Sequence, residues 1–227
     1  MIHGFSKASM YMFDQKVFTW SLPSGYTCFG ADKCLAYADR ITGKLTNGAN
    51  QEFRCYSAVT ERFPAVRAKY WSNWEAVKDK NQDQVADVLE CMPAKARIVR
   101  IHVAGDFFNQ SYFDGWINFA ARKFNVQFYA FTKSLPLWVL RQNNIPKNLK
   151  LIASHGGKYD SMIERYGLRS ARVVDSIADA QRLGLEVDYN DRVAAEGFES
   201  FALLNAPNGV RPAGSRTIPV TVKGEPA

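Results

Sequence analysis

Long hydrophobic runs are missing from this sequence. No apolar stretch reaches the roughly 18 residues that a membrane-spanning helix needs. The first residues, Met1 to Lys7, also lack the apolar core of a secretory signal peptide. We therefore expect a cytoplasmic protein that makes no membrane contact.

Cysteine and histidine are scarce as well. The chain of 227 residues has four cysteines and three histidines, and a cytoplasmic location would keep the cysteines reduced, so we expect no structural disulfides. The sequence also lacks internal repeats, low-complexity segments and a linker rich in proline and serine. These absences predict a single domain that covers residues 1–227.

Basic residues exceed acidic ones. There are 29 lysines and arginines against 22 aspartates and glutamates, which leaves a net charge of +7. This balance favours a polyanionic partner such as nucleic acid, although a basic enzyme that acts on small anions would have the same balance. With 47% hydrophobic and 13% aromatic residues, the chain has ample material for a folded core.

Strand and helix patterns alternate along the chain. A strand at 17–22 leads into an irregular, cysteine-bearing region at 23–55. The expected elements after this region are helices at 57–77 and 83–90, a strand ending near 106, a helix at 111–122, a strand at 126–132, a helix at 135–142, a strand at 149–154, a helix at 158–166, a strand at 171–174, a helix at 177–183, and strands at 185–188 and 201–204. This rhythm predicts an α/β domain with a (β/α) barrel-like fold, incomplete or irregular, and a cysteine-bearing N-terminal loop region.

The run from Arg97 to Phe108 is the most informative segment. Its β-branched residues are nearly continuous, which is typical of a buried parallel strand, and the run stops at Gly105-Asp106. In open α/β sheets and β/α barrels the carboxyl ends of the strands bind ligands, so we expect Asp106 to be catalytic. The alternative is that Gly105-Asp106 only forms the turn into the next helix. His102, inside the predicted strand, is expected to be buried and paired.

Polar residues follow the other expected strand ends, and they would lie on one face with Asp106. Carboxylates, a lysine and a histidine together suit acid–base or nucleophilic chemistry. Lys133 could hold a phosphate or stabilise developing negative charge, or it could be an ordinary solvated lysine. His155 could move a proton. The residues expected at this face are Lys133, Ser154, His155, Asp188 and Asp191.

Three of the four cysteines, Cys28, Cys34 and Cys55, fall in the irregular region. Thiolates at these positions could hold zinc with a fourth ligand from elsewhere, or an iron–sulfur cluster with one open iron. Their spacing is not the close pair of a structural zinc site, and ordinary buried thiols are the alternative. We expect these three cysteines to share one site, with Cys91 apart from them in the core.

Several segments resemble, in the same order, a family of phage and plasmid proteins catalogued as gene product 88. The segments that carry the resemblance are residues 27–34, 53–55, 100–107, 128–134 and 211–215. The resemblance implies a bacteriophage protein that works in the host cytoplasm. That family in turn resembles the phage DpdA proteins, distant relatives of the tRNA-guanine transglycosylases, which exchange guanine in DNA for a 7-deazaguanine base.

This second resemblance implies DNA and a 7-deazaguanine base as partners. Asp106 would be the nucleophile and would form a covalent glycosyl-aspartate as guanine leaves. Asp191 or Asp188 would recognise or protonate the base, and Lys133 would complete the catalytic set. Phe108 could stack on a base flipped from the duplex. Gln110, Ser154 and His155 are the other expected substrate-binding residues.

Two other functions fit the same residues. A cysteine loop after the first strand, followed by Gly105-Asp106 after the next, resembles the organisation of a radical SAM barrel. In that family the cluster follows the first strand and a glycine-acid motif contacts the cofactor. The spacing of Cys28, Cys34 and Cys55 is wider than the usual compact motif. The third function is a DNA-binding accessory protein without catalysis, whose loop binds zinc and whose strand-end loops grip phosphate.

Overall fold

A large, mostly parallel sheet forms the centre of the protein. The structure is a computed structural model that describes residues 3–8, 12–13, 16–52 and 55–205. Eight strands pair in the order β1-β2-β5-β6-β7-β8-β10-β9, and only β1 runs antiparallel to its neighbour. The strands are β1 (Ser6–Lys7), β2 (Val17–Trp20), β5 (Ile98–Ile101), β6 (Gln127–Thr132), β7 (Leu149–Ser154), β8 (Ser170–Val174), β9 (Glu186–Val187) and β10 (Phe201–Leu204).

A small hairpin lies apart from this sheet. It consists of β3 (Ala36–Ala38) and β4 (Leu45–Asn47), paired antiparallel. The helices are α1 (Tyr56–Thr60), α2 (Pro64–Val77), α3 (Gln82–Leu89), α4 (Gln110–Arg122), α5 (Leu135–Val139), a short 3-10 helix at Gln142–Asn144, α6 (Ser161–Arg165), α7 (Ile177–Arg182) and α8 (Arg192–Glu196). The longest, α2, has 14 residues, and the described part of the chain holds no helix of the length and apolarity that a membrane span requires.

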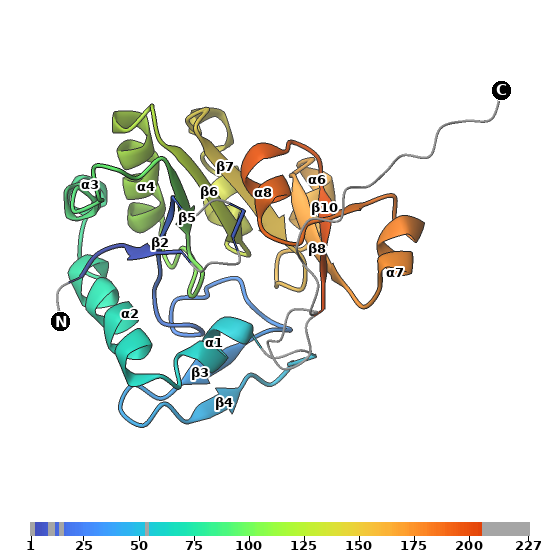
Figure 1. The fold of residues 1–227 in the computed structure, drawn as a ribbon, viewed down its shortest axis with the longest axis horizontal. Coiled ribbons are helices and arrows are strands. Elements are labelled where there is room, and N and C mark those ends of the chain that lie inside the picture. Colours follow the sequence, from blue (N-terminus) through green and yellow to red (C-terminus); the bar gives the residue numbers. More distant parts are fainter. Residues whose placement is uncertain (1–2, 9–11, 14–15, 53–54, 206–227) are drawn as a thin grey trace.

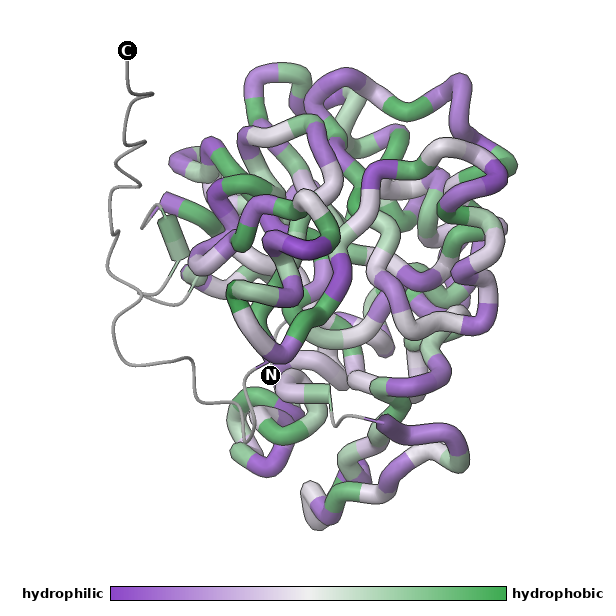
Figure 2. Tube along the Cα trace, turned by 90° about the vertical axis from the view of Figure 1, so that its right-hand side faces the viewer, coloured by the Kyte–Doolittle hydropathy of each residue, from purple (hydrophilic) through white to green (hydrophobic). Residues whose placement is uncertain are grey.

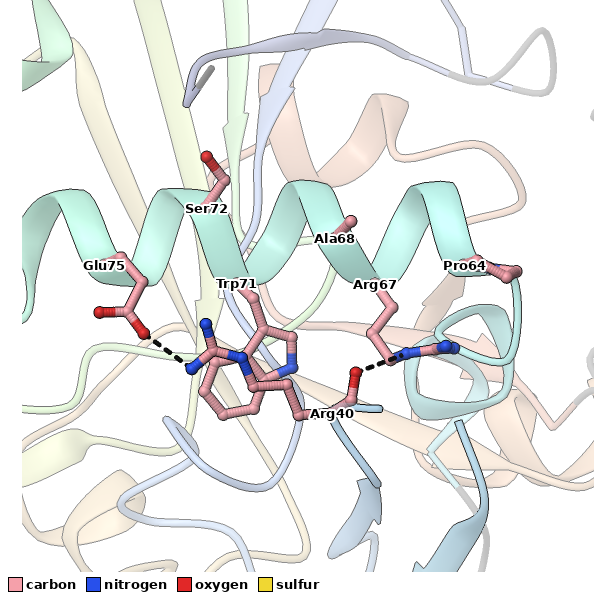
Figure 3. A pocket seen from close by; sticks show the side chains of 7 residues that line it. All are labelled: Arg40, Pro64, Arg67, Ala68, Trp71, Ser72 and Glu75. Atoms are coloured by element: carbon pink, nitrogen blue, oxygen red, sulfur yellow. Dashed lines mark hydrogen bonds and ion pairs between the residues drawn. The ribbon is translucent and has the colours of Figure 1, made fainter. Parts of the chain in front are cut away.

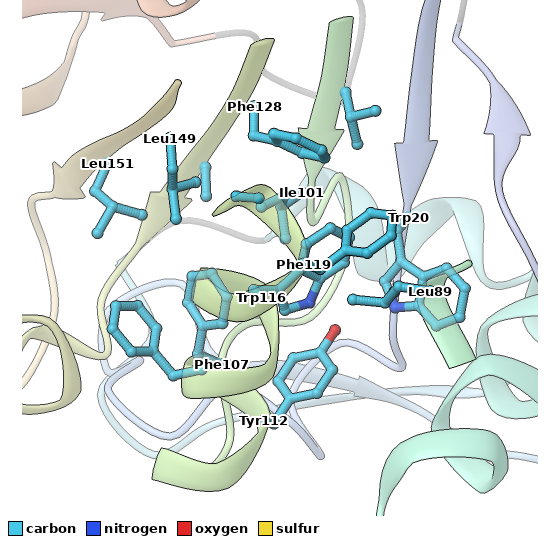
Figure 4. Close-up of a cluster of buried hydrophobic side chains, with 14 of the residues drawn as sticks. Trp20, Leu89, Ile101, Phe107, Tyr112, Trp116, Phe119, Phe128, Leu149 and Leu151 are labelled. Atoms are coloured by element: carbon cyan, nitrogen blue, oxygen red, sulfur yellow. The ribbon is translucent and has the colours of Figure 1, made fainter. Parts of the chain in front are cut away.

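Helices cover both faces of the sheet (Figure 1). On one face, α3 and α4 pack against β2, β5 and β6 through a cluster that includes Trp20, Ile101, Trp116 and Phe128 (Figure 4). On the other face, α8 packs on β6 and β7 through Tyr129, Ile152 and the alanines of α8. Burial on both faces explains the nearly continuous apolar strands. Figure 2 shows hydrophilic residues gathered along many of the outer turns.

The strand pairings confirm the predicted mixed α/β class and the parallel sheet. From β2 to β8 the strands follow one another in chain order, each parallel to the last. Among the described residues the pairings run from β1 at one edge to β9 at the other, which is an open order. Residues 211–215, which carry part of the family resemblance, lie outside the described residues.

Two predicted helices have other boundaries in the structure, and local sequence signals explain both differences. The helix predicted at 57–77 is two helices, because Pro64 lacks the N–H that a continuing helix needs and instead occupies the first turn of α2. The helix predicted to begin at Ser111 begins at Gln110, and its N-cap is Asn109, whose Oδ1 accepts from the Tyr112 N–H at 2.8 Å. The hairpin β3–β4 and helix α8 were not predicted.

Gly115 generates a prediction about the contact between α3 and α4. A Cβ at this position would lie 2.5 Å from Val85 Cβ on α3, so Gly115→Ala overpacks the contact. We expect the substitution to lower the free energy of unfolding by roughly 1–3 kcal/mol, although alanine favours helices. Urea denaturation measures the change.

Ala121, which is exposed on the same helix, provides a reference for the effect of helix propensity alone. The Ala121→Gly variant reports the helix-propensity difference between alanine and glycine without a packing change, which should be about 1 kcal/mol. A Gly115→Ala protein that is as stable as the wild type, or more stable, would contradict the close packing.

Candidate active site at the carboxyl ends of the strands

A cavity of about 320 Å³ opens at the carboxyl ends of the parallel strands. Its walls come from the ends of β5, β6, β7, β8 and β10, from the cysteine-bearing loop and from the segment between β9 and α8. Because parallel strands end at one edge of the sheet, residues far apart in the sequence meet there. The predicted site residues that line it are Cys28, Cys34, Cys55, Asp106, Lys133, Ser154, Asp188 and Asp191.

Three predicted site residues do not line the cavity. Phe108 stacks on Tyr112, with ring centroids 4.7 Å apart, and also contacts Trp74. The Gln110 side chain donates to the Asp114 carboxylate on its own helix at 2.7 Å. Phe108 comes just before Asn109, the N-cap of α4, and Gln110 is the first residue of that helix, where the chain leaves the strand ends. The His155 ring lies 3.3 Å from the Ser170 hydroxyl, outside the cavity.

The cysteine-bearing loop is fastened to the ends of β6 and β7. Lys158 N–H donates to the Gly30 carbonyl at 2.9 Å, and Lys33 N–H donates to the Gly156 carbonyl at 3.1 Å. Gly30 lies so close to Lys133 that an added Cβ would be 1.8 Å from the Lys133 carbonyl oxygen. Only glycine permits this approach, so Gly30 places the loop against the strand ends.

Three thiols, those of Cys28, Cys34 and Cys55, line the cavity, and their sharing of one metal site stays a prediction. Burial raises the pKa of the Cys34 thiol to about 11, with a further rise from Cys55 and Asp106. Burial also raises the pKa of the Cys28 thiol, again helped by Asp106 and the other two cysteines. Gly25 N–H donates to Cys28 Sγ at 3.2 Å.

Cys91 lies apart from these three, but the prediction that it belongs to the core is wrong. It follows the end of α3 and is exposed.

The three thiols do not converge on a single point. A zinc ion needs its donors within about 2.3 Å of one centre. Among the described residues, no group of three histidine, cysteine or acidic side chains is arranged to hold one metal ion in this way. In an iron–sulfur cluster each cysteine holds a different iron, so the sulfur atoms lie farther apart.

Asp106 is buried, and both of its carboxylate oxygens accept hydrogen bonds. Oδ1 accepts from Phe107 N–H at 2.7 Å and from the Thr132 hydroxyl at 2.6 Å, and Oδ2 accepts from Lys133 N–H at 2.8 Å. Burial raises the pKa of Asp106 to about 6, against the lowering effect of these donors. The carboxylate therefore joins the end of β5 to the end of β6.

Lys133 is buried, so the interpretation of a solvated surface lysine is wrong. Its Nζ donates to the Ser154 carbonyl at 2.9 Å, to the Ser154 hydroxyl at 2.7 Å and to the His155 carbonyl. An ammonium group has three hydrogens, and all three are used in these bonds. The side chain thus connects β6 to the end of β7.

Arg100 and Asp191 form a buried ion pair in the cavity wall. Arg100 Nη1 donates to Asp191 Oδ2, Nη2 donates to the Tyr56 hydroxyl at 2.9 Å, and Tyr129 donates to the same Asp191 oxygen at 3.1 Å. Asp191 has a φ of 69°, which only a minority of non-glycine residues adopt. Arg100 was not among the predicted site residues, although a charged residue within an otherwise apolar strand is a usable signal.

His102 is buried, as predicted, but it follows β5 instead of lying inside the strand, and only its Nε2 is paired: Nδ1 has no hydrogen-bond partner among the described residues. Its φ of 64° turns the chain, and its Nε2 lies 3.0 Å from the Tyr112 hydroxyl. Burial, helped by the charge of Arg100, lowers the pKa of His102 to about 3. The imidazole is therefore neutral at physiological pH.

A second, open cavity of about 590 Å³ lies along α2. Arg40 lies over the Trp71 ring at 4.5 Å and donates to Glu75 at 2.8 Å, while Arg67 Nε donates to the Arg40 carbonyl at 3.0 Å (Figure 3). These polar groups pair with one another. The lining includes no cysteine, histidine or aspartate, so we place the site at the strand ends.

Comparison with known proteins identifies the family. Residues 5–218 match the family described as gene product 88. The chain belongs to the gene product 88 family. It is 27% identical over 158 residues to the Gene 88 protein of Mycobacterium phage D29, an alignment that covers 65% of this chain and 60% of that protein. No solved structure matches the chain. The predicted gene product 88 resemblance is confirmed, and the relation to DpdA stays a prediction.

Glu61 lies beneath the cysteine-bearing loop and generates a pH prediction. It is fully buried, its Oε1 accepts from Ser24 N–H at 2.7 Å, and its Oε2 has no partner among the described residues. Burial raises its pKa to about 7. A raised folded-state pKa means that the native protein binds more protons than the unfolded chain over this range of pH. The free energy of unfolding of the wild type therefore falls as pH rises from about 4.3 to 7.

Glu61→Gln keeps the acceptor for Ser24 and removes this cost. Its stability relative to the wild type should therefore rise by up to about 3 kcal/mol between pH 5 and pH 8, at 1.36 kcal/mol for each pKa unit. Denaturant unfolding at both pH values measures the difference. Glu90→Gln, at an exposed glutamate, is the control. If the stability difference between Glu61→Gln and the wild type is the same at both pH values, the raised pKa of Glu61 is refuted.

Proposed function

We propose that this protein is an iron–sulfur enzyme of the radical SAM type. Cys28, Cys34 and Cys55 would hold the cluster, and the iron without a cysteine would bind S-adenosylmethionine. The observation that supports this proposal is that three thiols line the same cavity as Gly105 and Asp106, at the carboxyl ends of parallel strands. The consecutive strand order also suits the barrel-like architecture predicted from the sequence.

The residues around the thiols fit such a group. Thiolates are the ligands that iron–sulfur clusters take, and bound cations would offset the burial that now keeps Cys28 and Cys34 protonated. The Gly25 N–H that faces Cys28 Sγ would stabilise a thiolate there. Three cysteines leave one iron of a four-iron cluster open for a ligand.

Cys28, Cys34 and Cys55 would hold the group, which would supply one-electron reduction of S-adenosylmethionine and so radical chemistry on a substrate. The residues of this chain would position and protect the reactants. Asp106 and Lys133 hold the strand ends against the cysteine-bearing loop. Asp106 has no oxygen without a hydrogen bond, which suits this positioning role.

Metal content tests the proposal. Protein purified without oxygen should contain about four irons and an equal amount of acid-labile sulfide per chain, and it should absorb visible light. Cys28→Ala, Cys34→Ala and Cys55→Ala should each lose most of this iron, because each removes one cluster ligand. Iron and sulfide assays and an absorption spectrum are the measurements.

Cys91→Ala is the matched control, since Cys91 lies outside the cavity, and it should keep its iron. Purified protein that holds about one zinc per chain, or no metal, would overturn the proposal. A zinc-bearing protein that also binds DNA would instead support the accessory role considered from the sequence.

Guanine exchange in DNA is the second candidate function. It is favoured by the three carboxylates that line the cavity, Asp106, Asp188 and Asp191, and by burial, which raises the pKa of Asp106 to about 6 and also raises that of Asp188. Asp106 would attack the sugar as guanine leaves, and DNA and a 7-deazaguanine base would be the substrates.

Asp106→Asn tests this candidate. An amide cannot form the glycosyl ester, so incorporation of labelled guanine into DNA should fall by several orders of magnitude relative to the wild type. Asp87→Asn, at an exposed aspartate on α3, should retain the wild-type rate. If wild-type protein exchanges no labelled guanine, or if Asp106→Asn exchanges it at a near-normal rate, the candidate is eliminated.

A further inference from the structure

Exposed apolar side chains flank the open groove along α2 (Figure 3). Ile41, in the turn between β3 and β4, is 85% exposed, and Phe63, just before α2, is 66% exposed. Pro64 and Trp71, on α2, line the groove itself. Large exposed apolar side chains next to a groove are typical of a surface that binds another molecule. We call this surface, with the exposed residues of the β3–β4 turn and of the segment between α1 and α2, the α2 face.

Arg67 holds the two segments of the α2 face side by side. Its buried side chain donates to the Arg40 carbonyl at 3.0 Å and to the Ile41 carbonyl at 2.9 Å, both in the β3–β4 turn. The same guanidinium donates to the Glu61 carbonyl at 2.6 Å and to the Arg62 carbonyl at 3.2 Å, between α1 and α2. A surface whose parts are already fixed in the free protein loses less entropy when it binds a partner.

The charges of the α2 face favour an acidic partner. Arg40, Lys44 and Arg62 are exposed there, and the last two form no ion pair with another residue that the structure describes. The acidic side chains of this face are used within the protein, because Asp39 accepts from N–H groups of its own turn and Glu75 pairs with Arg40. Exposed apolar side chains beside unpaired cations suit the acidic surface of a protein, whereas a nucleic acid is held mainly by polar and basic side chains.

Two short elements connect the α2 face to the thiols. Helix α1 begins after Cys55, which lines the cavity at the strand ends, and it ends two residues before Arg62. With five residues, α1 is about 8 Å long. Strand β3 begins two residues after Cys34, has three residues and leads into the turn that bears Ile41. Helix α1 contacts β3 (Figure 1). The α2 face is therefore one short element away from two of the three thiols.

We infer that the α2 face docks an acidic electron-carrier protein, which delivers one electron to the group held by Cys28, Cys34 and Cys55. The carrier is oxidised by one electron, the group is reduced by one electron, and no covalent bond forms or breaks. The inference names the partner of the proposed enzyme and so rests on the proposed function, which needs an electron from outside the chain. No residue lines both the groove and the cavity at the strand ends, so a bound carrier leaves that cavity to the substrate.

Charge reversal on the α2 face tests the inference. The variant carries Lys44→Glu and Arg62→Glu, both at exposed residues. The probe is a fully reduced flavodoxin, a small acidic flavin protein, and stopped-flow absorbance measures how fast it reduces the oxygen-free protein. At low salt the variant should be reduced about 10-fold more slowly than the wild type, or slower still, because complementary charges speed association. Added salt should shrink this difference.

The matched control carries Lys95→Glu and Lys147→Glu, at exposed residues that precede β5 and β7 and so lie at the opposite ends of these strands from the thiols. It should keep the wild-type rate with flavodoxin. Reduced methyl viologen, a small cationic reductant, should reduce the Lys44→Glu, Arg62→Glu variant no more slowly than the wild type. Equal flavodoxin rates in the two charge-reversal variants, or slow reduction of the first variant by methyl viologen as well, would overturn the docking role.

Binding without electron transfer separates this inference from the proposed function. Labelled, oxidised flavodoxin is titrated with iron-free and iron-loaded protein, and the Lys44→Glu, Arg62→Glu variant should bind it more weakly in both forms. Flavodoxin binding by a protein that takes up no iron would refute the cluster alone, and iron without flavodoxin binding would refute this inference alone. If the variant instead loses binding to a DNA duplex or to a second copy of the chain, with flavodoxin binding unchanged, the inference is overturned.

Discussion

The buried carboxylate of Asp106 holds the site together. It accepts from the backbone N–H groups of Phe107 and Lys133 and from the Thr132 hydroxyl, so it joins the ends of two neighbouring strands. The Lys133 carbonyl then lies against Gly30, which sets the position of the cysteine-bearing loop. Cys28 and Cys34 lie on either side of Gly30 in this loop, and they line the same cavity as Cys55. Burial of the charge raises the pKa of Asp106, which is the cost of the arrangement.

Strongly patterned elements could be predicted from the sequence. Strands β7 and β10 have the predicted bounds, because each is a short, mostly apolar run with polar residues on both sides. The short elements could not be predicted, since tertiary contacts stabilise them. Helix α8 has five residues, and the Asp188 carboxylate accepts from its Ala194 N–H at 2.9 Å. A helix of this length has no periodicity that a sequence pattern could reveal.

The residues of the candidate site also fall into those that could be predicted from the sequence and those that could not. Asp106, Lys133 and the three cysteines of the loop could be predicted because each follows a strand end or lies in the loop between strands. Phe108 and Gln110 do not line the cavity, because the chain leaves the strand ends there and enters α4 after its N-cap, Asn109. Arg100 was missed because its partner, Asp191, lies 91 residues away in the sequence. Only the folded sheet shows that a charge inside β5 is neutralised by a residue beyond β9.

In the proposed function the thiols bind the reactive group, and the carboxylates hold the site in shape. Both oxygens of Asp106 and the Oδ2 of Asp191 accept hydrogen bonds from donors within the protein, whereas Cys28, Cys34 and Cys55 line the cavity with thiols that a bound metal would hold as thiolates. The two cations in the cavity wall are also paired within the protein. Arg100 pairs with Asp191, and Lys133 donates to Ser154.

Mössbauer spectroscopy of protein enriched in iron-57 tests the central claim most directly, because it reports each iron of a cluster separately. With three cysteine ligands, one iron of four should differ from the rest, and its signal alone should shift when S-adenosylmethionine is added. Four equivalent irons whose signals ignore S-adenosylmethionine, or a protein that takes up no iron, would contradict the account.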